Sequence, residues 1–235
     1  MGGGTGSRLM PLTKIINKNV LAIYDKPLIY YPICTLRDAG IKEILLISGR
    51  GHAGQYLDLL SSGRELNVKL TYEIQEEPKG IAQALSIAED FADSGPIAMI
   101  LGDNIYEENL KLAVDDFIKQ EKGAKIIIKE VSDPQRFGVV EFDGDRIVDI
   151  QEKPQFPKSN WIVSGFYMYD SRCFDFIRGL RPSARGELEV TDLNNCYLRD
   201  GSLTYYKTTG EWIDAGTFDS LLKANIFIAK KQGKL

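Results

Sequence analysis

The first stretch of the chain whose composition suits the binding of phosphate groups is residues 2–9, Gly-Gly-Gly-Thr-Gly-Ser-Arg-Leu. Glycines let successive backbone N–H groups turn toward one point and let the chain approach a pyrophosphate closely. Arg8 adds a permanent charge whose forked donors match phosphate oxygens, and Lys18 follows at a distance from which a loop can fold back over the same phosphates. The spacing is neither GxxxxGK[ST] nor GxGxxG. Taken alone, the stretch is as typical of a flexible tail as of an anion-binding loop.

A carboxylate follows a predicted buried strand at Leu-Gly-Asp-Asn, residues 101–104. This order places Asp103 at the carboxyl end of the strand, where ligands bind in open α/β sheets. A carboxylate there suits a magnesium ion that bridges triphosphate oxygens. An isolated Gly-Asp-Asn is more often a turn, so Asp103 needs further support as a metal ligand.

The first half of the chain alternates apolar runs with helical patterns. Strands are predicted at 43–48, 70–74, 96–101 and 124–131, and helical stripes at 28–39, 81–91 and 110–117. Such alternation predicts an α/β protein with a Rossmann-like, mostly parallel mixed sheet flanked by helices.

The pattern changes after Val131. The runs 139–142 and 147–151 flank Asp143-Gly144 and predict a hairpin. Further strands are predicted at 161–169 and 203–208, and a closing helix at 217–231. This half is expected to form a smaller, partly antiparallel region.

Composition limits the classes of partner. The chain has 235 residues, 43% of them hydrophobic, which is enough for one sizeable core and predicts a single domain. A formal net charge of −4 argues against a nucleic-acid partner, which would need a basic face. The chain lacks the roughly 18 to 20 consecutive apolar residues that would span a bilayer, so we expect a cytoplasmic protein with no membrane contact.

The glycine loop extends into a longer pattern through Pro11, Thr13, Lys18 and the run Tyr-Asp-Lys-Pro-Leu-Ile-Tyr-Tyr-Pro at 24–32. This pattern resembles the signature of the sugar-nucleotide pyrophosphorylases, and within them most resembles the glucose-1-phosphate thymidylyltransferase branch. Ser7 stands where the family commonly has Thr, and Ala22 where it often has Pro.

The resemblance covers nearly the whole chain and implies the nucleotide-diphospho-sugar transferase fold. It implies a single nucleotidyltransferase domain over 1–235, with residues 1–131 mainly binding nucleotide and residues 132–235 mainly binding the sugar phosphate. Family members have an apolar strand before the glycine loop, and we expect that first strand to be absent here.

The resemblance also implies the residues of the site. Asp103 and Asp214, the latter in Trp-Ile-Asp-Ala-Gly-Thr at 212–217, would bind Mg²⁺. Arg8, Lys18, Asp103 and Lys153 would be catalytic. The nucleotide would be bound by Gly3, Gly4, Thr5, Gly6, Ser7, Gln75, Pro78, Gly80 and Ile81, with Gln75 on the base. The sugar phosphate would be bound by Asn104, Gly138, Glu152, Lys153, Val163, Tyr167 and Arg185.

The implied reaction joins dTTP and glucose 1-phosphate to give dTDP-glucose, typically for the dTDP-rhamnose pathway. A UTP-using or other sugar nucleotidyltransferase remains an alternative, because thymine and uracil differ by one methyl group. A non-catalytic nucleotide-sugar-binding subunit is a second alternative on the same fold. Relatives are commonly homo-oligomers, so we expect one here. The longer members carry a helical tail that helps form a regulatory nucleotide site, and the sequence leaves open whether this chain has such a site.

Overall fold

The computed structural model describes Met1 and residues 6–235. The chain forms two compact units. Unit 1 comprises Met1–Pro78, Ile100–Lys111 and Gly210–Leu235, and unit 2 comprises Lys79–Met99 and Leu112–Thr209. Helices and a mixed set of parallel and antiparallel strands confirm the predicted α/β class. In the part of the chain that the structure describes, no helix has the length and apolar character to cross a membrane.

Unit 1 contains short strand pairs and helices. Its elements are η1 (Ser7–Leu9), η2 (Leu12–Lys14), η3 (Lys18–Val20), β1 (Ala22–Ile23), β2 (Lys26–Pro27), α1 (Tyr30–Asp38), β3 (Glu43–Gly49), α2 (Ala53–Leu60), η4 (Arg64–Leu66), β4 (Lys69–Gln75), β6 (Asn104–Tyr106), β12 (Trp212–Asp214) and α8 (Phe218–Lys231). Strands β3 and β4 are parallel, whereas β1 with β2 and β6 with β12 are antiparallel.

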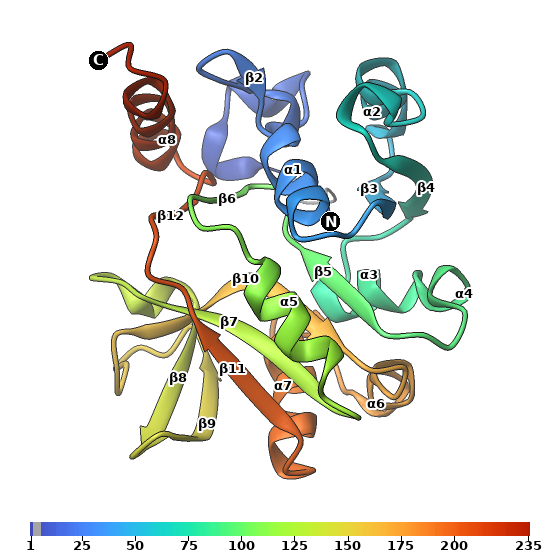
Figure 1. Cartoon of the computed structure of the whole chain (residues 1–235), viewed down its shortest axis with the longest axis vertical. Helices are drawn as coiled ribbons and strands as arrows, with labels where there is room; N and C mark the ends of the chain where they lie inside the picture. Colours follow the sequence, from blue (N-terminus) through green and yellow to red (C-terminus); the bar gives the residue numbers. More distant parts are fainter. Residues whose placement is uncertain (2–5) are drawn as a thin grey trace. The chain divides into compact units, whose positions relative to one another are not determined.

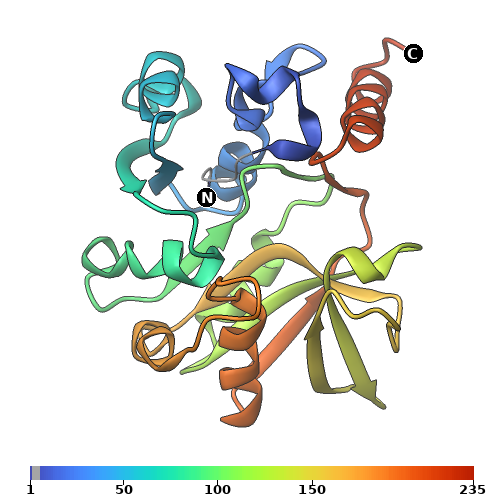
Figure 2. The same ribbon diagram turned by 180° about the vertical axis from the view of Figure 1, so that it is seen from behind.

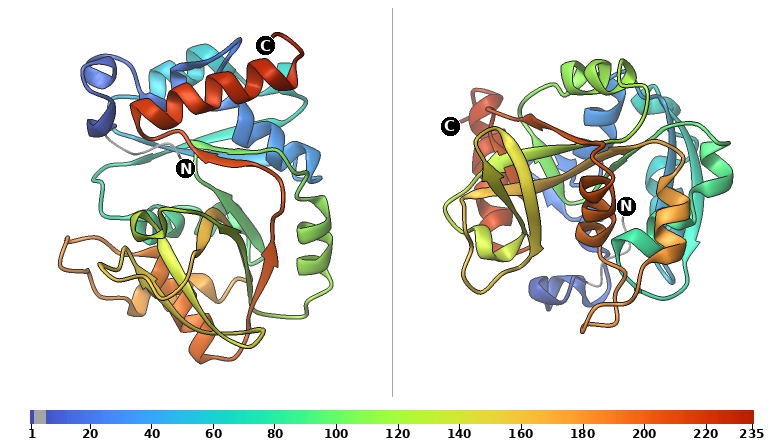
Figure 3. Two further views of the ribbon diagram at one scale, coloured as in Figure 1. Left: turned by 90° about the vertical axis from the view of Figure 1, so that its left-hand side faces the viewer. Right: turned by 90° about the horizontal axis from the view of Figure 1, so that it is seen from below.

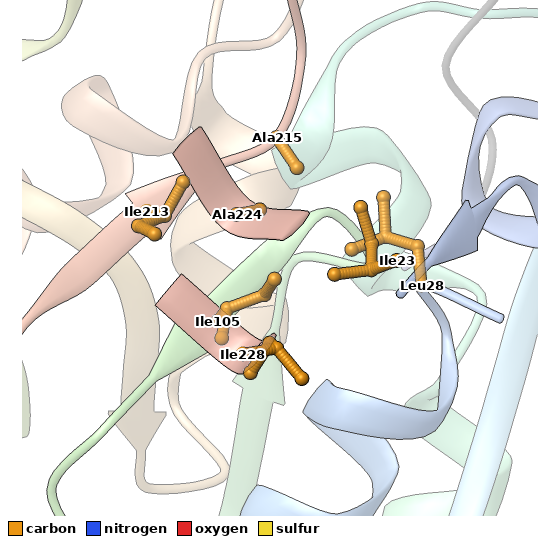
Figure 4. Packing of buried hydrophobic residues seen from close by; sticks show 7 residues of the cluster. All are labelled: Ile23, Leu28, Ile105, Ile213, Ala215, Ala224 and Ile228. Carbon is orange, nitrogen blue, oxygen red and sulfur yellow. The ribbon is translucent and has the colours of Figure 1, made fainter. Parts of the chain in front are cut away.

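The core of unit 1 draws on three separate stretches of the chain. Helix α8 lies along the segment that carries β1 and β2 (Figure 3). Thr217 begins α8 with a capping box, in which its hydroxyl and that of Ser220 each bond the other residue's backbone N–H. Figure 4 shows the buried side chains that meet under this helix, which are Ile23, Leu28, Ile105, Ile213, Ala215, Ala224 and Ile228.

Unit 2 is built around a larger sheet. Its elements are α3 (Ile81–Ser86), α4 (Glu89–Ala92), β5 (Ile97–Ile100), α5 (Lys111–Ile118), β7 (Ala124–Glu130), η5 (Pro134–Arg136), β8 (Gly138–Asp143), β9 (Arg146–Glu152), β10 (Trp161–Tyr169), α6 (Cys173–Gly179), α7 (Val190–Arg199) and β11 (Leu203–Lys207); the last residue of β5 and the first of α5 fall in unit 1. The strand order is β11-β7-β10-β8-β9, and β5 also pairs with β10 (Figure 1).

Pairing in this sheet is mixed. Strand β11 is parallel to β7, while β7 with β10, β8 with β10 and β8 with β9 are antiparallel. Figure 2 shows the β8–β9 hairpin in olive and yellow. Ile126, Ile127 and Ile128 of β7 are all fully buried, which explains the continuous apolar run in the sequence.

Strand predictions agree with the structure within one or two residues at 43–48, 70–74, 139–142, 147–151 and 161–169. The prediction of one helix over 81–91 is wrong, because α3 and α4 are separate helices. The backbone N–H groups of Ile87 and Ala88 bond back three residues, to Ala84 and Leu85, so the α-helical pattern ends there. The apolar stripe continues across this break, which is why its spacing suggested one helix.

Candidate active site

Gly6 and the short helix η1 form the described part of the glycine loop. Gly3, Gly4 and Thr5 lie outside the described residues. Gly6 has φ +63°, and its carbonyl oxygen accepts bonds from the Leu9 N–H at 2.9 Å and the Thr13 hydroxyl at 2.7 Å. A Cβ at Gly6 would lie 2.9 Å from Thr13 Cγ2 and 3.3 Å from Lys18 Cβ. Glycine is therefore required here both by φ and by space, and the loop packs against the stem of Lys18.

Lys18 and Asp103 form a largely buried ion pair between Nζ and Oδ2, with side chains 15% and 11% exposed. Burial lowers the pKa of Lys18, but the Asp103 charge and hydrogen bond, with a contribution from Asp214, outweigh it and raise that pKa overall. Burial likewise raises the pKa of Asp103, but Lys18 and the Asn104 amide outweigh it and hold the pKa below its usual range. Both groups are therefore charged near neutral pH.

Asn104 is held on both sides of its amide. Its Nδ2 donates to Asp103 Oδ1 at 2.9 Å, and its Oδ1 accepts a bond from Trp212 Nε1 at 2.8 Å. Asn104 is 2% exposed, and burial in this network fixes the direction in which its amide points. The sequence pattern predicted no role for Trp212, although this residue lies in the motif that contains Asp214.

Asp214 lies opposite Asn104 in the β6–β12 pair, and the Ala215 N–H donates to the Asp103 carbonyl at 2.9 Å. A Cβ at Gly216 would lie 2.9 Å from Asp214 Oδ1 and 2.7 Å from Arg8 Nη2. Glycine at position 216 thus leaves room for a carboxylate and a guanidinium beside the same backbone atom. Unit 1 accordingly brings together Arg8, Lys18, Asp103, Asn104 and Asp214, and we call this set the carboxylate–cation cluster.

The two carboxylates fit a divalent-metal site of the kind that shares its ion with a substrate. Among Met1 and residues 6–235, no group of three or more His, Cys, Asp or Glu side chains could hold a metal by itself. Mg²⁺ is commonly held by one or two carboxylates and completes its shell with phosphate oxygens and water. Asp103 and Asp214 provide that number of carboxylates, on adjoining backbone.

Gln75 ends β4 and lies opposite Gly49, the last residue of the parallel strand β3. It is 6% exposed, unusually buried for an amide side chain. Pro78 follows three residues later and is exposed. These positions lie at the carboxyl ends of parallel strands, where α/β proteins bind ligands.

Gly80 begins the part of the predicted nucleotide site that belongs to unit 2. Its φ is +102°, and a Cβ there would lie 2.4 Å from the Leu188 carbonyl oxygen. Leu188 is also hydrogen-bonded to the residues around Gly80. Its N–H donates to the Lys79 carbonyl oxygen at 2.8 Å, and its carbonyl oxygen accepts a bond from the Ala82 N–H at 3.1 Å. The atoms that leave no room for a side chain at Gly80 are thus backbone atoms of Leu188. Ile81 follows as the first residue of α3.

Glu152 is the centre of a second group of charged side chains, in unit 2. Thr191 Oγ1 donates to Glu152 Oε2 at 2.6 Å, and Arg185 Nη2 donates to Glu152 Oε1 at 3.2 Å. Arg185 also donates to Glu189 Oε2 at 2.9 Å, and Lys153 Nζ lies 3.4 Å from Glu152 Oε1. We call Glu152, Lys153, Arg185, Glu189 and Thr191 the Glu152 cluster.

Lys153 has φ +44°, a conformation that non-glycine residues rarely adopt. Its backbone N–H donates to Phe137 O at 2.9 Å, which holds it at the end of β9. Strained backbone of this kind is concentrated at functional sites. Gly138, opposite Glu152 in β8, would place a Cβ 3.1 Å from Thr191 Oγ1, so it lets Thr191 approach Glu152 closely.

Val163 and Tyr167 lie on β10, on the two sides of a register shift against β7. Both are buried, and the Tyr167 ring stacks on Tyr169 at 6.2 Å between centroids. Gly165 lies between them with φ +80°. Sequence analysis missed Thr191 and Glu189 as partners of this region; a hydroxyl and a carboxylate within the stretch 183–192 were the available signal.

The model of the nucleotidyl transferase family matches residues 1–231, so this chain belongs to that family, and its α/β fold and buried lysine–aspartate pair are consistent with membership. The chain is 43% identical over 237 residues to the glucose-1-phosphate thymidylyltransferase of Neisseria meningitidis, a match that covers 99% of this chain and 82% of the relative. It is 41% identical over 232 residues to the enzyme of the same name from Mycobacterium tuberculosis, covering 97% of this chain and 80% of that one.

Solved structures show the same fold. A protein from Bacillus anthracis, assigned as a glucose-1-phosphate thymidylyltransferase and solved with sucrose, aligns with a TM-score of 0.92 at 46% identity over 96% of this chain and 92% of that one. A UDP-glucose pyrophosphorylase solved with UDP-glucose aligns with a TM-score of 0.87 at 25% identity, over 98% and 97% of the two chains.

Proposed function

We propose that this chain is a magnesium-dependent glucose-1-phosphate thymidylyltransferase that makes dTDP-glucose and pyrophosphate from dTTP and glucose 1-phosphate. The single observation that carries the proposal is the carboxylate–cation cluster, in which two cations and two carboxylates lie together in unit 1. Relatives at about 42% identity over nearly the whole chain carry the name of this activity.

The reaction needs no covalent enzyme intermediate. A phosphate oxygen of glucose 1-phosphate, already an anion, forms a new P–O bond to the α-phosphorus of dTTP. The bond between the α-phosphorus and the bridging oxygen breaks, and pyrophosphate leaves with the electron pair. Because both substrates are polyanions, catalysis consists of positioning them and balancing the charge that develops on the leaving group.

We assign binding of the triphosphate to unit 1. Arg8 and Lys18 supply fixed positive charge, and Gly6 and Ser7 belong to the loop that would bring backbone N–H groups to the phosphates. Asp103 and Asp214 would hold Mg²⁺, which, when bound, neutralises phosphate oxygens as a Lewis acid. Lys18 would then exchange part of its contact with Asp103 for a phosphate oxygen, and Asn104 keeps Asp103 oriented meanwhile.

We assign binding of the sugar phosphate to unit 2. Lys153 and Arg185 supply the cations, while Glu152 is a hydrogen-bond acceptor suited to sugar hydroxyls. Gly138, Val163 and Tyr167 would shape the sugar pocket. Arg185 and Lys153 both contact Glu152, so this carboxylate keeps the two cations close together.

Gln75 would read the pyrimidine, because one amide presents both a donor and an acceptor to the base edge. UTP offers the same edge, and one methyl group is worth about 1 to 3 kcal/mol. We therefore expect dTTP to be preferred and UTP to be used measurably. The likeness to a UDP-glucose pyrophosphorylase makes UTP the first competing substrate to test.

The test is pyrophosphate release by the purified chain with glucose 1-phosphate, Mg²⁺ and each of dTTP, UTP, CTP, GTP and ATP. Release with dTTP at a rate equal to or above that with UTP supports the proposal. A strong preference for another triphosphate would assign the chain to a sister activity. Binding of dTDP-glucose with no release from any triphosphate would instead favour a non-catalytic nucleotide-sugar-binding subunit.

A further inference from the structure

Tyr56 of α2 is fully buried, and its hydroxyl bonds the side chains of both residues that flank Lys18. It donates to Asn17 Oδ1 at 2.8 Å and accepts from Asn19 Nδ2 at 3.0 Å. Asn17 and Asn19 are 2% and 1% exposed. One hydroxyl is therefore attached to the chain on each side of the lysine that pairs with Asp103.

The same helix also holds the backbone of this segment. Gln55 accepts a bond from the Asn17 N–H at 3.0 Å and donates to the Ile15 carbonyl at 3.0 Å. Asn17 in turn caps η3 by accepting a bond from the Asn19 N–H at 2.9 Å. The turn that carries Lys18 is thus fixed by side chains of α2 and by its own cap.

Asn19 extends this network toward the partner of Lys18. A Cβ at Gly102 would lie 2.8 Å from Asn19 Nδ2, the atom that donates to Tyr56. Gly102 directly precedes Asp103 in the chain. The amide that bonds the Tyr56 hydroxyl therefore packs against the backbone next to the carboxylate, and its displacement would affect both members of the ion pair.

We propose that Tyr56 is a positioning residue that holds the Lys18 ammonium in place through Asn17 and Asn19; this inference rests on the proposed function of Lys18 at the triphosphate. Tyr56 has no charge to contribute and is buried, so it acts through its neighbours. Small displacements of a charged group from its transition-state position cost large factors in rate, whereas binding of a substrate held elsewhere is unaffected.

The test is Tyr56→Phe, which removes one oxygen and keeps the ring. We expect kcat to fall about 10-fold while KM for glucose 1-phosphate changes less than about 2-fold. Tyr72→Phe is the matched control, because the Tyr72 hydroxyl donates to Ser61 O at 2.6 Å at the other end of α2, away from Lys18. Its kcat should equal that of the wild type. An unchanged kcat in Tyr56→Phe, even with a lower melting temperature, would mean that Tyr56 is only structural and would overturn the proposal.

Amide hydrogen exchange gives a readout that does not depend on activity. Peptides covering residues 15–21 should exchange faster in Tyr56→Phe than in the wild type, and peptides covering α1 should not. Equal exchange over 15–21 in the two proteins would overturn the positioning role. If the wild-type chain releases no pyrophosphate from any triphosphate, the proposed function fails, and the exchange comparison still decides whether Tyr56 holds the Lys18 turn.

Discussion

The Ala215 backbone N–H donates to the Asp103 carbonyl oxygen at 2.9 Å. Ala215 directly follows Asp214, so this bond connects the backbones of the two predicted metal ligands, Asp103 and Asp214. Asp214 and Asp103 are 111 positions apart in the numbering, yet this bond and the β6–β12 pair fix their backbones side by side.

Removing the carboxylate of Asp103 or of Asp214 should raise the Mg²⁺ concentration that the reaction needs. For Asp103→Asn and Asp214→Asn we expect the half-saturating Mg²⁺ concentration for pyrophosphate release to rise at least about 10-fold. Adding EDTA to the wild type should abolish release, and Mg²⁺ should restore it. Asp115→Asn, on α5, is a control that should leave the Mg²⁺ dependence unchanged. Equal Mg²⁺ titrations in wild type and both variants would contradict the assigned metal site.

Arg8→Ala should lower kcat about 10²-fold or more, because it removes fixed positive charge from the developing pyrophosphate. KM for glucose 1-phosphate should change little, since we assign that substrate to unit 2. Arg50→Ala is a suitable comparison: Arg50 lies in the same unit and pairs with Glu76 at 3.6 Å, but both side chains are mostly exposed. Similar kcat losses in the two variants would indicate a general charge effect.

Thr191→Val should weaken sugar-phosphate binding. The change removes the 2.6 Å bond to Glu152 Oε2 while keeping the shape of the side chain. A hydrogen bond to a charged acceptor contributes about 1.5 to 3 kcal/mol, so KM for glucose 1-phosphate should rise about 10- to 100-fold, with KM for dTTP nearly constant. Thr204→Val, which removes a 2.8 Å bond to Gln120 in the same unit, should leave both KM values unchanged. A rise in both KM values for Thr191→Val would argue against a specific role at the sugar.

Gly80→Ala should destabilise unit 2. A methyl group would meet the Leu188 carbonyl at 2.4 Å, and a φ of +102° is unfavourable for alanine. We expect a loss of about 1 to 3 kcal/mol in the free energy of unfolding, measured by urea denaturation. Gly144→Ala separates the two causes, because Gly144 also has positive φ but has nothing within 4 Å of the new methyl. Equal losses in the two variants would mean that contact with Leu188 is unimportant.

Asp116 should make stability depend on pH. Its hydrogen bond to Lys125, at 2.7 Å, and the lysine charge lower the pKa of Asp116 in the folded chain. The stabilisation is therefore present above the unfolded pKa near 4 and is lost as pH falls through the folded value. Since Asp116 is mostly exposed, Asp116→Asn should cost less than about 1 kcal/mol at pH 7. The difference from wild type should shrink in denaturation at acidic pH; a constant difference would rule out the ion pair as its cause.

Sequence patterns predicted the long elements well and the short ones poorly. The run 161–169 became β10 with the same bounds, because nine residues of one pattern give a clear signal. Strands β6 and β12 have three residues each and exist because they pair with one another, across a separation that no local pattern contains. The break between α3 and α4 was likewise hidden, because the apolar spacing continues through it.

The sequence predicts residues of the site one by one, but it does not predict how they are arranged. Resemblance named Lys18 and Asp103 separately, and only the structure shows that they form a buried pair across 85 positions. Thr191 and Tyr56 were missed because their partners are distant in the sequence. Thr191 bonds Glu152, 39 positions away, and Tyr56 bonds Asn19, 37 positions away and next to Lys18. Polar side chains that support a charged group have no spacing rule of their own.

The core shown in Figure 4 has a consequence for synthesis of the chain. Ile23 and Leu28 precede the residues of unit 2 in the chain, whereas their partners Ile213, Ala224 and Ile228 follow them. Unit 2 ends at Thr209, so all of its residues leave the ribosome before unit 1 can close its core. Unit 2 is therefore the first of the two units whose residues are all synthesised, and Ile23 and Leu28 are without their partners on α8 until that helix is made. Chaperone dependence during translation should accordingly be concentrated on residues 6–78.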